Sequence, residues 1–345
     1  MHIEVYTSAS AFQELRAEWG QLLSQLPFQS VFYTPEWQET WWRHFGASHQ
    51  LRLLAVRSAA GFLQGLVPLM ESPAAEGPPT LTLLGDLEVC DYLDVLTSSM
   101  QSQVVAQVVV EYLLQQSGDH FALHLPNVSH CSSTLDAFHQ QLLRAGLKVE
   151  VEQIETCPTI DLPTDWEDYL TMLRGKDRHE LRRKLRRAEA AAQLEYHVTQ
   201  DAAHLDADID TFVALHRMSQ QDAKQGFMTA EKEAFFRDMA HQMWAQGWLD
   251  LAFLAADGAP IATLCCFTYG TTYAAYNSGY HPGYSELSAG IVLFAERIRA
   301  AITRGFTTFD FMRGNESYKY RFGATDRPLY QLFARTACPV QGSPL

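Results

Sequence analysis

The same order of secondary-structure signals occurs twice along this chain of 345 residues. Apolar runs at residues 51–57 and 62–70, separated by a glycine-containing turn, predict a β-hairpin in the first half. Runs at residues 249–255 and 260–268, separated by an Asp-Gly turn, predict a second hairpin. Each hairpin is followed by a strand, a helix and another strand, at residues 80–84, 103–115 and 121–126 and at residues 272–280, 291–303 and 306–312. Two copies of one α/β unit are the simplest fold that accounts for this repeat.

The chain is long enough to form two domains, each with a core of its own. Hydrophobic residues make up 47% of the sequence, and a chain of this size more often forms two domains than one. The join is expected near Pro158 and Pro163, because two prolines so close together limit regular structure. We therefore expect domains at residues 1–160 and 161–345.

Cysteine usage and the N-terminal sequence predict a reducing compartment. The six cysteines show no CxxC spacing and no regular intervals, so neither a zinc site nor a disulfide framework is indicated. The N-terminal residues show no basic stretch followed by an apolar run, the pattern of a secretory signal. The longest apolar stretch, near residues 104–114, is interrupted by Gln107 and Glu111 and is far shorter than the ~18 residues that span a bilayer. These features predict a cytoplasmic protein without a membrane span or a bound metal.

Charge separates one segment from the rest of the chain. The net charge of −14 argues against nucleic acid as a general partner. Residues 174–187 are an exception to this acidic charge. This segment, which contains Arg183, is a dense run of Arg and Lys. Leucines at helical intervals predict that the segment is an amphipathic helix. Its charged face has two interpretations that the sequence leaves open, a solvated surface or a binding site for the phosphate of a substrate or carrier.

A glycine-containing loop distinguishes the second copy from the first. Leu287, Ser288, Ala289 and Gly290 stand between the strand at residues 272–280 and the next helix. A glycine before an apolar helix lets backbone N–H groups point outward at the helix N-terminus, where the helix dipole favours an anion. After a pair of strands, such a loop suits the pyrophosphate of a cofactor such as coenzyme A. The first copy lacks this loop, so the second is predicted to bind the cofactor and the first to be a scaffold and a substrate wall.

Five other residues of the second copy are candidates for contact with a substrate or for catalysis. Tyr276 and Tyr280 share one face of a strand by two-residue alternation, where aromatic side chains line either the core or a substrate pocket. Asp310 and Arg313 bracket the end of the last strand, a common place for chemistry in open α/β folds, and a mutual salt bridge is the alternative. His216 follows an apolar helical stretch and is either a buried histidine with its hydrogen bonds satisfied or a base or substrate-binding group.

The second half resembles the acyltransferase domain of CelD-like proteins, a branch of the GNAT superfamily related to the FemABX transferases. The resemblance covers roughly residues 165–330 and rests on the order of several short segments. These are residues 176–184, 215–216, Phe227, and residues 258–262, 278–282, 287–290, 309–314 and 318–323. The resemblance implies an α/β (α+β) fold of two tandem GNAT-like domains with mixed sheets flanked by helices, in agreement with the repeat.

The resemblance also implies where an acyl donor lies. In GNAT-like enzymes the carrier occupies a splay between the fourth and fifth strands, which we assign to residues 261–269 and 272–280. Backbone N–H groups of the first of these strands are then expected to face the acyl carbonyl. Tyr318 and Lys319 are expected where the final strand opens into the cleft, the phenol to protonate a thiolate and the lysine to neutralise phosphate or oxyanion charge. An ordinary amphipathic turn is the alternative for these two residues.

The implied reaction is transfer of an acyl group from acetyl-CoA, or another acyl-CoA, to the amine of a small molecule. The acceptor is expected to be a sugar, an amino acid or a precursor of the cell envelope or of a polysaccharide. The predicted catalytic residues are Lys319, Tyr318 and Asp310, and the predicted substrate contacts are Tyr276, Tyr280, His216, Arg313 and Arg183. Two other hypotheses stay open. One is a FemABX-like transferase that takes its aminoacyl group from tRNA, which the Arg/Lys run would suit, and the other is a non-catalytic scaffold of polysaccharide assembly.

Overall fold

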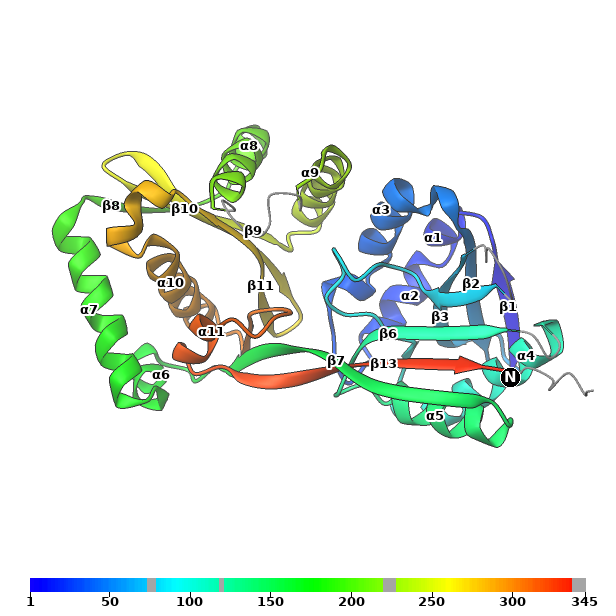
Figure 1. Ribbon diagram of the computed structural model, residues 1–345. Helices are drawn as coiled ribbons and strands as arrows, with labels where there is room; N and C mark the ends of the chain where they lie inside the picture. The colour runs from blue at the N-terminus through cyan, green and yellow to red at the C-terminus, as the bar shows by residue number, and fades with distance from the viewer. Residues whose placement is uncertain (73–78, 118–120, 220–227, 337–345) are drawn as a thin grey trace, which may run out of the picture. The chain divides into compact units, whose positions relative to one another are not determined.

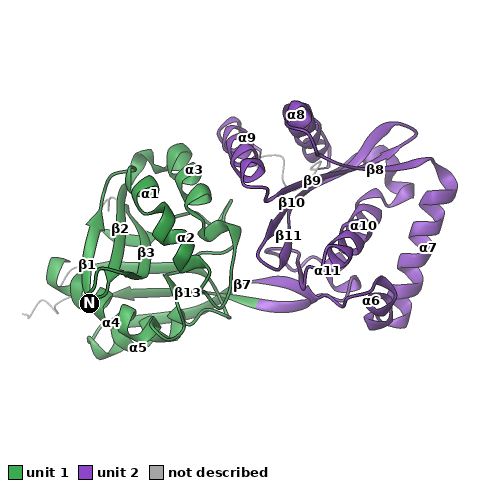
Figure 2. Ribbon diagram, turned by 180° about the vertical axis from the view of Figure 1, so that it is seen from behind, with its two compact units in different colours: residues 1–155, 328–345 green, residues 156–327 purple. Residues whose placement is uncertain are grey.

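The computed structural model describes residues 1–72, 79–117, 121–219 and 228–336 of the chain. The chain forms two compact units, which we call unit 1 (Met1–Glu155 with Pro328–Leu345) and unit 2 (Thr156–Arg327) (Figure 2). The sequence placed the division at residue 160 and the whole C-terminal stretch in the second domain. In the structure the chain returns to unit 1 at Pro328. Phe227, one residue of the resemblance, lies outside the described residues.

Unit 1 is built on a mixed sheet. The strands β1 (His2–Tyr6), β2 (Gln50–Arg57), β3 (Leu63–Ser72) and β4 (Thr80–Leu83) pair antiparallel in that order, β5 (Leu96–Thr97) also pairs with β3, and β4 is parallel to β6 (Ala122–Ser129). The helices are α1 (Ala11–Glu14), α2 (Arg16–Leu23), α3 (Pro35–Phe45), α4 (Ser102–Ser117) and α5 (Thr134–Arg144), with the 3-10 turns η1 (Val31–Tyr33) and η2 (Gly46–Ser48). Helix α4 packs against β1, β2 and β3, and α5 packs against α4.

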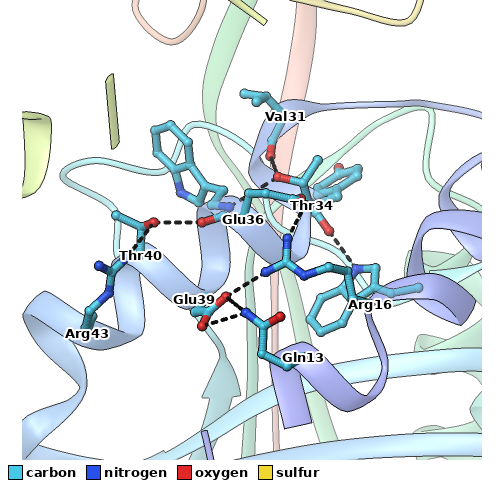
Figure 3. A network of polar contacts seen from close by, with 11 residues as sticks. Gln13, Arg16, Val31, Thr34, Glu36, Glu39, Thr40 and Arg43 are labelled. Carbon is cyan, nitrogen blue, oxygen red and sulfur yellow. Dashed lines mark hydrogen bonds and ion pairs between the residues drawn. The ribbon is translucent and has the colours of Figure 1, made fainter. Parts of the chain in front are cut away.

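A polar network fixes the start of α3 in unit 1 (Figure 3). Thr34 caps this helix, because its hydroxyl accepts a hydrogen bond from the N–H of Trp37 at 3.2 Å. Arg16, at the start of α2, bonds the carboxylate of Glu36 and, at 2.7 Å, that of Glu39. These contacts tie α2 to α3 at the edge of a core that contains several fully buried aromatic side chains.

Unit 2 places helices on both faces of its sheet. The strands β8 (Leu194–Val198), β9 (Leu249–Ala256), β10 (Ala259–Tyr269) and β11 (Thr272–Tyr280) pair antiparallel in that order, and β11 is parallel to β12 (Thr308–Asp310). The helices are α6 (Trp166–Met172), α7 (Gly175–Ala191), α8 (Ala202–Met218), α9 (Ala230–Ala245), α10 (Ala289–Thr303) and α11 (Ser317–Arg321), with the 3-10 segment η3 (Pro282–Leu287). Figure 1 shows α8 and α9 on one face of the sheet and α10 on the other. Helices on both faces explain why β9 and β10 are buried along most of their length.

Two strands, β7 (Lys148–Asp161) and β13 (Thr325–Arg335), each contribute to both units. In unit 1, β13 pairs antiparallel with β6, and in unit 2, β7 pairs antiparallel with β12. The strands thereby form one mixed sheet in the order β1-β2-β3-β4-β6-β13-β7-β12-β11-β10-β9-β8.

The repeat predicted from the sequence is confirmed. Both units contain a hairpin, a third antiparallel strand, a crossover helix and a strand parallel to the third. The parallel pairs begin at equivalent places, with Thr80 opposite Ala122 in unit 1 and Thr272 opposite Thr308 in unit 2. The last strand of the second copy is shorter than expected, because the chain turns at Met312, whose φ is 58°. Within the described ranges, no helix is both long enough and apolar enough to cross a bilayer.

Candidate active site

A cavity of ≈ 330 Å³ in unit 2, which we call the main cavity, lies beside the N-terminal end of α10. It brings together five residues predicted from the sequence, namely Tyr280, Ser288, Ala289, Gly290 and Tyr318. Lys184 of α7 and residues of β10 and β11 complete its wall. The other predicted residues lie elsewhere in unit 2, and each is described below. The structure therefore brings three residues of the predicted loop together with two of the three predicted tyrosines in one cavity.

The N-terminus of α10 faces the main cavity. Ser288, the residue before the helix, has φ 53° and ψ 42°, a left-handed conformation that turns the chain into α10. The N–H of Val292 donates to the carbonyl of Ser288 at 3.1 Å, so the N–H groups before Val292 have no acceptor within the helix. Gly290 has no atom within 4 Å of the place where a Cβ would stand. Leu287 instead packs its side chain into the core.

Two basic side chains of α7 approach this helix end. Arg187 donates from Nη2 to the hydroxyl of Ser288 at 2.9 Å, and Lys184 lines the main cavity. Burial lowers the pKa of Lys184, and the positive charges of Arg187, Arg321 and Arg183 lower it further, against the opposing effect of Glu180. The helix dipole and these side chains create a positive potential suited to a phosphate group.

Arg183, the residue of this basic segment that was predicted to contact substrate, is exposed. It forms a bidentate pair with Glu180, with distances of 2.7 and 2.8 Å. Lys184 and Arg187 were missed by the sequence analysis, although the signal was present. Leu181 and Ala188 are the buried residues of α7. Lys184 stands one helical turn from each of them, and Arg187 stands one turn after Lys184.

The expected splay lies one strand away from the assigned position. β10 and β11 are joined by a tight turn and pair along their whole length, from Ala262 opposite Tyr280 to Tyr269 opposite Thr272. The N–H groups of β10 are therefore occupied, since β9 pairs with its other edge. In contrast, β12 pairs with only residues 272–274 of β11. The assignment to residues 261–269 and 272–280 was wrong, and the splay is between β11 and β12.

A β-bulge explains why β11 leaves β12. The register with β10 passes from Asn277 opposite Cys265 to Ala275 opposite Cys266, which leaves Tyr276 without an opposite residue. A bulge bends and twists its strand, and here it lies two residues after Ala274, the last residue paired with β12. The bulge also interrupts the two-residue alternation on which the prediction for Tyr276 depended. Tyr276 packs against Phe267, with 5.1 Å between ring centroids, and is not among the residues that line the main cavity.

The open edge of β11 presents backbone donors to the main cavity. The N–H of His281 donates to Ile261 in β10 at 2.9 Å, so by the alternation of an antiparallel ladder Ser278 and Tyr280 direct their backbone groups away from β10. The carbonyl of Ser278 accepts a hydrogen bond from Nδ1 of His216 at 2.9 Å, and its N–H donates a hydrogen bond to Oδ1 of Asn277 at 3.2 Å. Backbone N–H groups on an open strand edge are suited to hold the oxygen of a thioester carbonyl.

His216 is a buried residue that supports this edge. Its side chain is 2% exposed and stacks on Phe212, with 5.6 Å between ring centroids. Because the carbonyl of Ser278 can only accept, Nδ1 of His216 carries the proton of this hydrogen bond. A Cβ on Gly279 would lie 2.4 Å from the backbone nitrogen of His216, so α8 and β11 are in direct backbone contact here. This position favours a structural role for His216. Direct contact of His216 with a substrate stays a prediction.

Lys319 holds the loop after β12. Its ammonium group lies 2.9–3.0 Å from the carbonyl oxygens of Met312, Arg313 and Gly314 and 2.9 Å from the carboxylate of Glu316. The residue is 2% exposed. The ammonium therefore has four acceptors around it, more than its three protons can each serve singly. These contacts favour a positioning role, and the catalytic role expected from the sequence stays a prediction.

Tyr318 and Asp310 lie on either side of this loop. Burial raises the pKa of the Tyr318 phenol well above its usual range, and the charge of Glu316 adds to this effect. The phenol is therefore protonated at neutral pH and lines the main cavity as a hydrogen donor. Asp310 is 2% exposed and accepts a hydrogen bond from the N–H of Met312 at 2.7 Å.

A splayed parallel pair beside a helix N-terminus, in one of two repeated α/β units, defines a tandem GNAT architecture. Residues 175–320 match the family described as "Acetyltransferase (GNAT) domain", which is the CelD-like family. This segment of the chain is therefore similar to a GNAT domain, and the resemblance stated from the sequence is confirmed. No curated protein sequence matches the chain at a significant level.

Solved structures share the fold over nearly the whole chain. The crystal structure of FemX aligns with a TM-score of 0.69 at 12% identity, covering 98% of each chain. L-PGS from Bacillus licheniformis aligns with a TM-score of 0.56 at 12% identity, covering 93% of this chain and 91% of that one. A tandem GNAT protein from the clavulanic acid biosynthesis pathway aligns with a TM-score of 0.50 at 13% identity, covering 96% and 98%. At such low identities these similarities establish the fold alone.

Proposed function

We propose that this protein is an N-acyltransferase that uses acetyl-CoA or another acyl-CoA as its donor. The observation that carries the proposal is the N-terminus of α10 with Arg187 bonded to Ser288 and Lys184 in the wall of the main cavity. These groups offer a place for the pyrophosphate of coenzyme A. From there the acyl-bearing arm would enter the splay between β11 and β12.

The chemistry would need little more than positioning and charge stabilisation, because a thioester is already activated. The N–H of Tyr280, and that of Ser278 once it is released from Oδ1 of Asn277, would bind the carbonyl oxygen as negative charge develops on it. An amine of the acceptor would attack the carbonyl carbon, the carbon–sulfur bond would then break, and the nitrogen would release its extra proton to solvent. The Tyr318 phenol would give its proton to the departing thiolate. Lys319 would act by holding the loop that precedes Tyr318.

The acceptor that we propose is the amine of a sugar, of an amino acid or of a precursor of the cell envelope or of a polysaccharide. This part of the proposal rests on the family resemblance and on the size of the main cavity, which suits a small molecule rather than a protein surface. Arg313 and Asp310, at the end of β12, are proposed to contribute to the acceptor side.

An aminoacyl transferase that takes its donor from tRNA is the second candidate. The observation that favours it is the exposed basic face of α7, where Arg182, Arg183 and Arg186 are open to solvent. The phosphate backbone of a nucleic acid binds such a face in a salt-dependent manner. A non-catalytic scaffold would keep the fold without either activity.

The donor can be identified by thermal unfolding. Acetyl-CoA at 100 times its Kd should stabilise the folded protein by about 2.7 kcal/mol, which raises Tm by several degrees. The same measurement with aminoacyl-tRNA at low salt tests the second candidate, and turnover with a panel of amines tests catalysis. A shift with aminoacyl-tRNA and none with acetyl-CoA would overturn the donor that we propose. Binding of acetyl-CoA without turnover of any amine would favour the scaffold.

A further inference from the structure

A row of cavities continues from the main cavity along the inner side of α7. A narrow cavity of ≈ 30 Å³ shares Lys184 and Ile291 with the main cavity. A third cavity of ≈ 330 Å³ shares Asp177 and Arg321 with the narrow one. These shared residues place the three in sequence, so we call the narrow cavity the passage. The passage therefore adjoins the N-terminus of α10.

The passage contains two cations without an acidic partner. Lys184 and Arg321 both line it, and neither forms an ion pair with any residue that the structure describes. Two acids also line the passage, but Asp177 is paired with Arg174 at 2.7 Å and Glu180 with Arg183 at 2.7 Å. The positive charge of Arg321 lowers the pKa of Lys184, against a larger opposing effect of Glu180, so the two cations are close enough to repel each other. A bound anion would remove this repulsion.

The spacing along α7 suits a second phosphate. Lys184 stands three residues before Arg187, so the two lie on one side of the helix about 5 Å apart along its axis. Arg187 bonds Ser288 at the N-terminus of α10, where the pyrophosphate is proposed to bind. In coenzyme A, one ribose separates the pyrophosphate from the 3′-phosphate. We infer that Lys184 and Arg321 bind the 3′-phosphate of the acyl-CoA donor, an inference that rests on the proposed function.

The test compares coenzyme A with dephospho-coenzyme A, which lacks only this phosphate. Titration calorimetry on the wild-type protein should give a Kd for coenzyme A that is at least about tenfold lower, the effect of one charge-assisted contact. Arg321→Met should weaken coenzyme A by about tenfold and leave dephospho-coenzyme A within about twofold, whereas Lys184→Met, which also removes a cation from the pyrophosphate site, should weaken both ligands and coenzyme A more strongly. Methionine keeps most of the aliphatic stem, so packing is retained. Arg186→Met is the matched control, since Arg186 is an exposed cation of the same helix that lines none of these cavities.

The outcomes separate this inference from the proposal on which it rests. If wild-type protein binds the two ligands equally, or if Arg321→Met weakens both alike, the 3′-phosphate is not bound here and only this inference fails. If wild-type protein binds neither ligand, the acyl-CoA donor itself is overturned and this inference with it. Equal losses in Lys184→Met and Arg186→Met would assign the effect to the general charge of α7 and also overturn it.

Discussion

Lys319 serves three carbonyl oxygens of one loop, and this number makes its replacement costly. Lys319→Met should lower the free energy of unfolding by about 3 kcal/mol or more, because buried acceptors lose their donor. The loop contains Met312 with φ 58° and Gly314 with φ 109°, so its conformation depends on such contacts. Urea denaturation measures the loss, and Lys176→Met, at an exposed lysine of α7, is the control. A variant as stable as the control, but with turnover reduced about 10²-fold, would restore the catalytic assignment.

Asp94 of unit 1 is a buried carboxyl group whose charge depends on pH near neutrality. Burial raises its pKa from 3.8 to about 6, against hydrogen bonds donated by Thr134, Ser132 and the N–H of Val95. Because the folded state holds this proton more tightly than the unfolded state, the contribution of Asp94 to stability is complete below pH 3.8 and is lost as pH rises through about 6.

Replacement of Asp94 tests the direction of this change in stability with pH. From pH 4 to pH 7, the stability of wild-type protein relative to Asp94→Asn should fall by up to about 3 kcal/mol, since asparagine has no proton to lose. Chemical denaturation of both proteins across this range measures the difference. A difference that stays constant with pH, or that grows in favour of the wild type as pH rises, would contradict the assignment.

At the scale of elements, Gly279 and Gly290 differ in the space that surrounds them. Gly279 allows α8 to lie directly on β11, because a Cβ there would stand 2.4 Å from the nitrogen of His216, whereas a Cβ on Gly290 would meet no atom within 4 Å. Gly279→Ala should therefore lower the free energy of unfolding by about 3 kcal/mol. Gly290→Ala should leave it within about 1 kcal/mol.

Substitution of Gly290 should change donor binding rather than stability. In Gly290→Ala, and more so in Gly290→Val, the thermal shift with acetyl-CoA should be lost or greatly reduced, because the added carbon occupies the space that the donor needs. Differential scanning fluorimetry with and without acetyl-CoA measures both stability and binding. A Gly290→Val protein that responds normally to the ligand would remove this loop from the donor site.

The splay shows that single strands can be predicted from the sequence, whereas the edge at which two strands separate cannot. The strands at residues 261–269 and 272–280 were predicted within a few residues, because apolar alternation is a local signal. The edge at which β11 opens depends on the bulge at Tyr276 and on α8 packed against Gly279. Neither the bulge nor that packing has a signature in the local sequence, and so the splay was assigned to the wrong pair of strands.

At the scale of the whole molecule, the duplicated fold and the loop at Ser288 followed from the sequence. The order of elements and the glycine before α10 are local patterns, and the family resemblance agreed with both. The choice among basic residues of α7 did not follow, because Arg183 and Lys184 are adjacent and only the packing of the helix decides which one faces α10. Lys319 was found as a distinctive residue, but its three carbonyl partners come from a loop whose conformation the sequence alone did not reveal.

The shared strands determine when each unit can be completed as the chain leaves the ribosome. β6 of unit 1 pairs with β13, and β13 is made only after all of unit 2 has been synthesised. Synthesis of unit 1 therefore begins first and ends last. The edge of β6 that pairs with β13 stays unpaired while unit 2 is being made. Unit 2, by contrast, holds every strand of its own sheet within one continuous stretch of chain. The N-terminal unit thus depends on the C-terminal one for the timing of its own completion, although its sequence comes first.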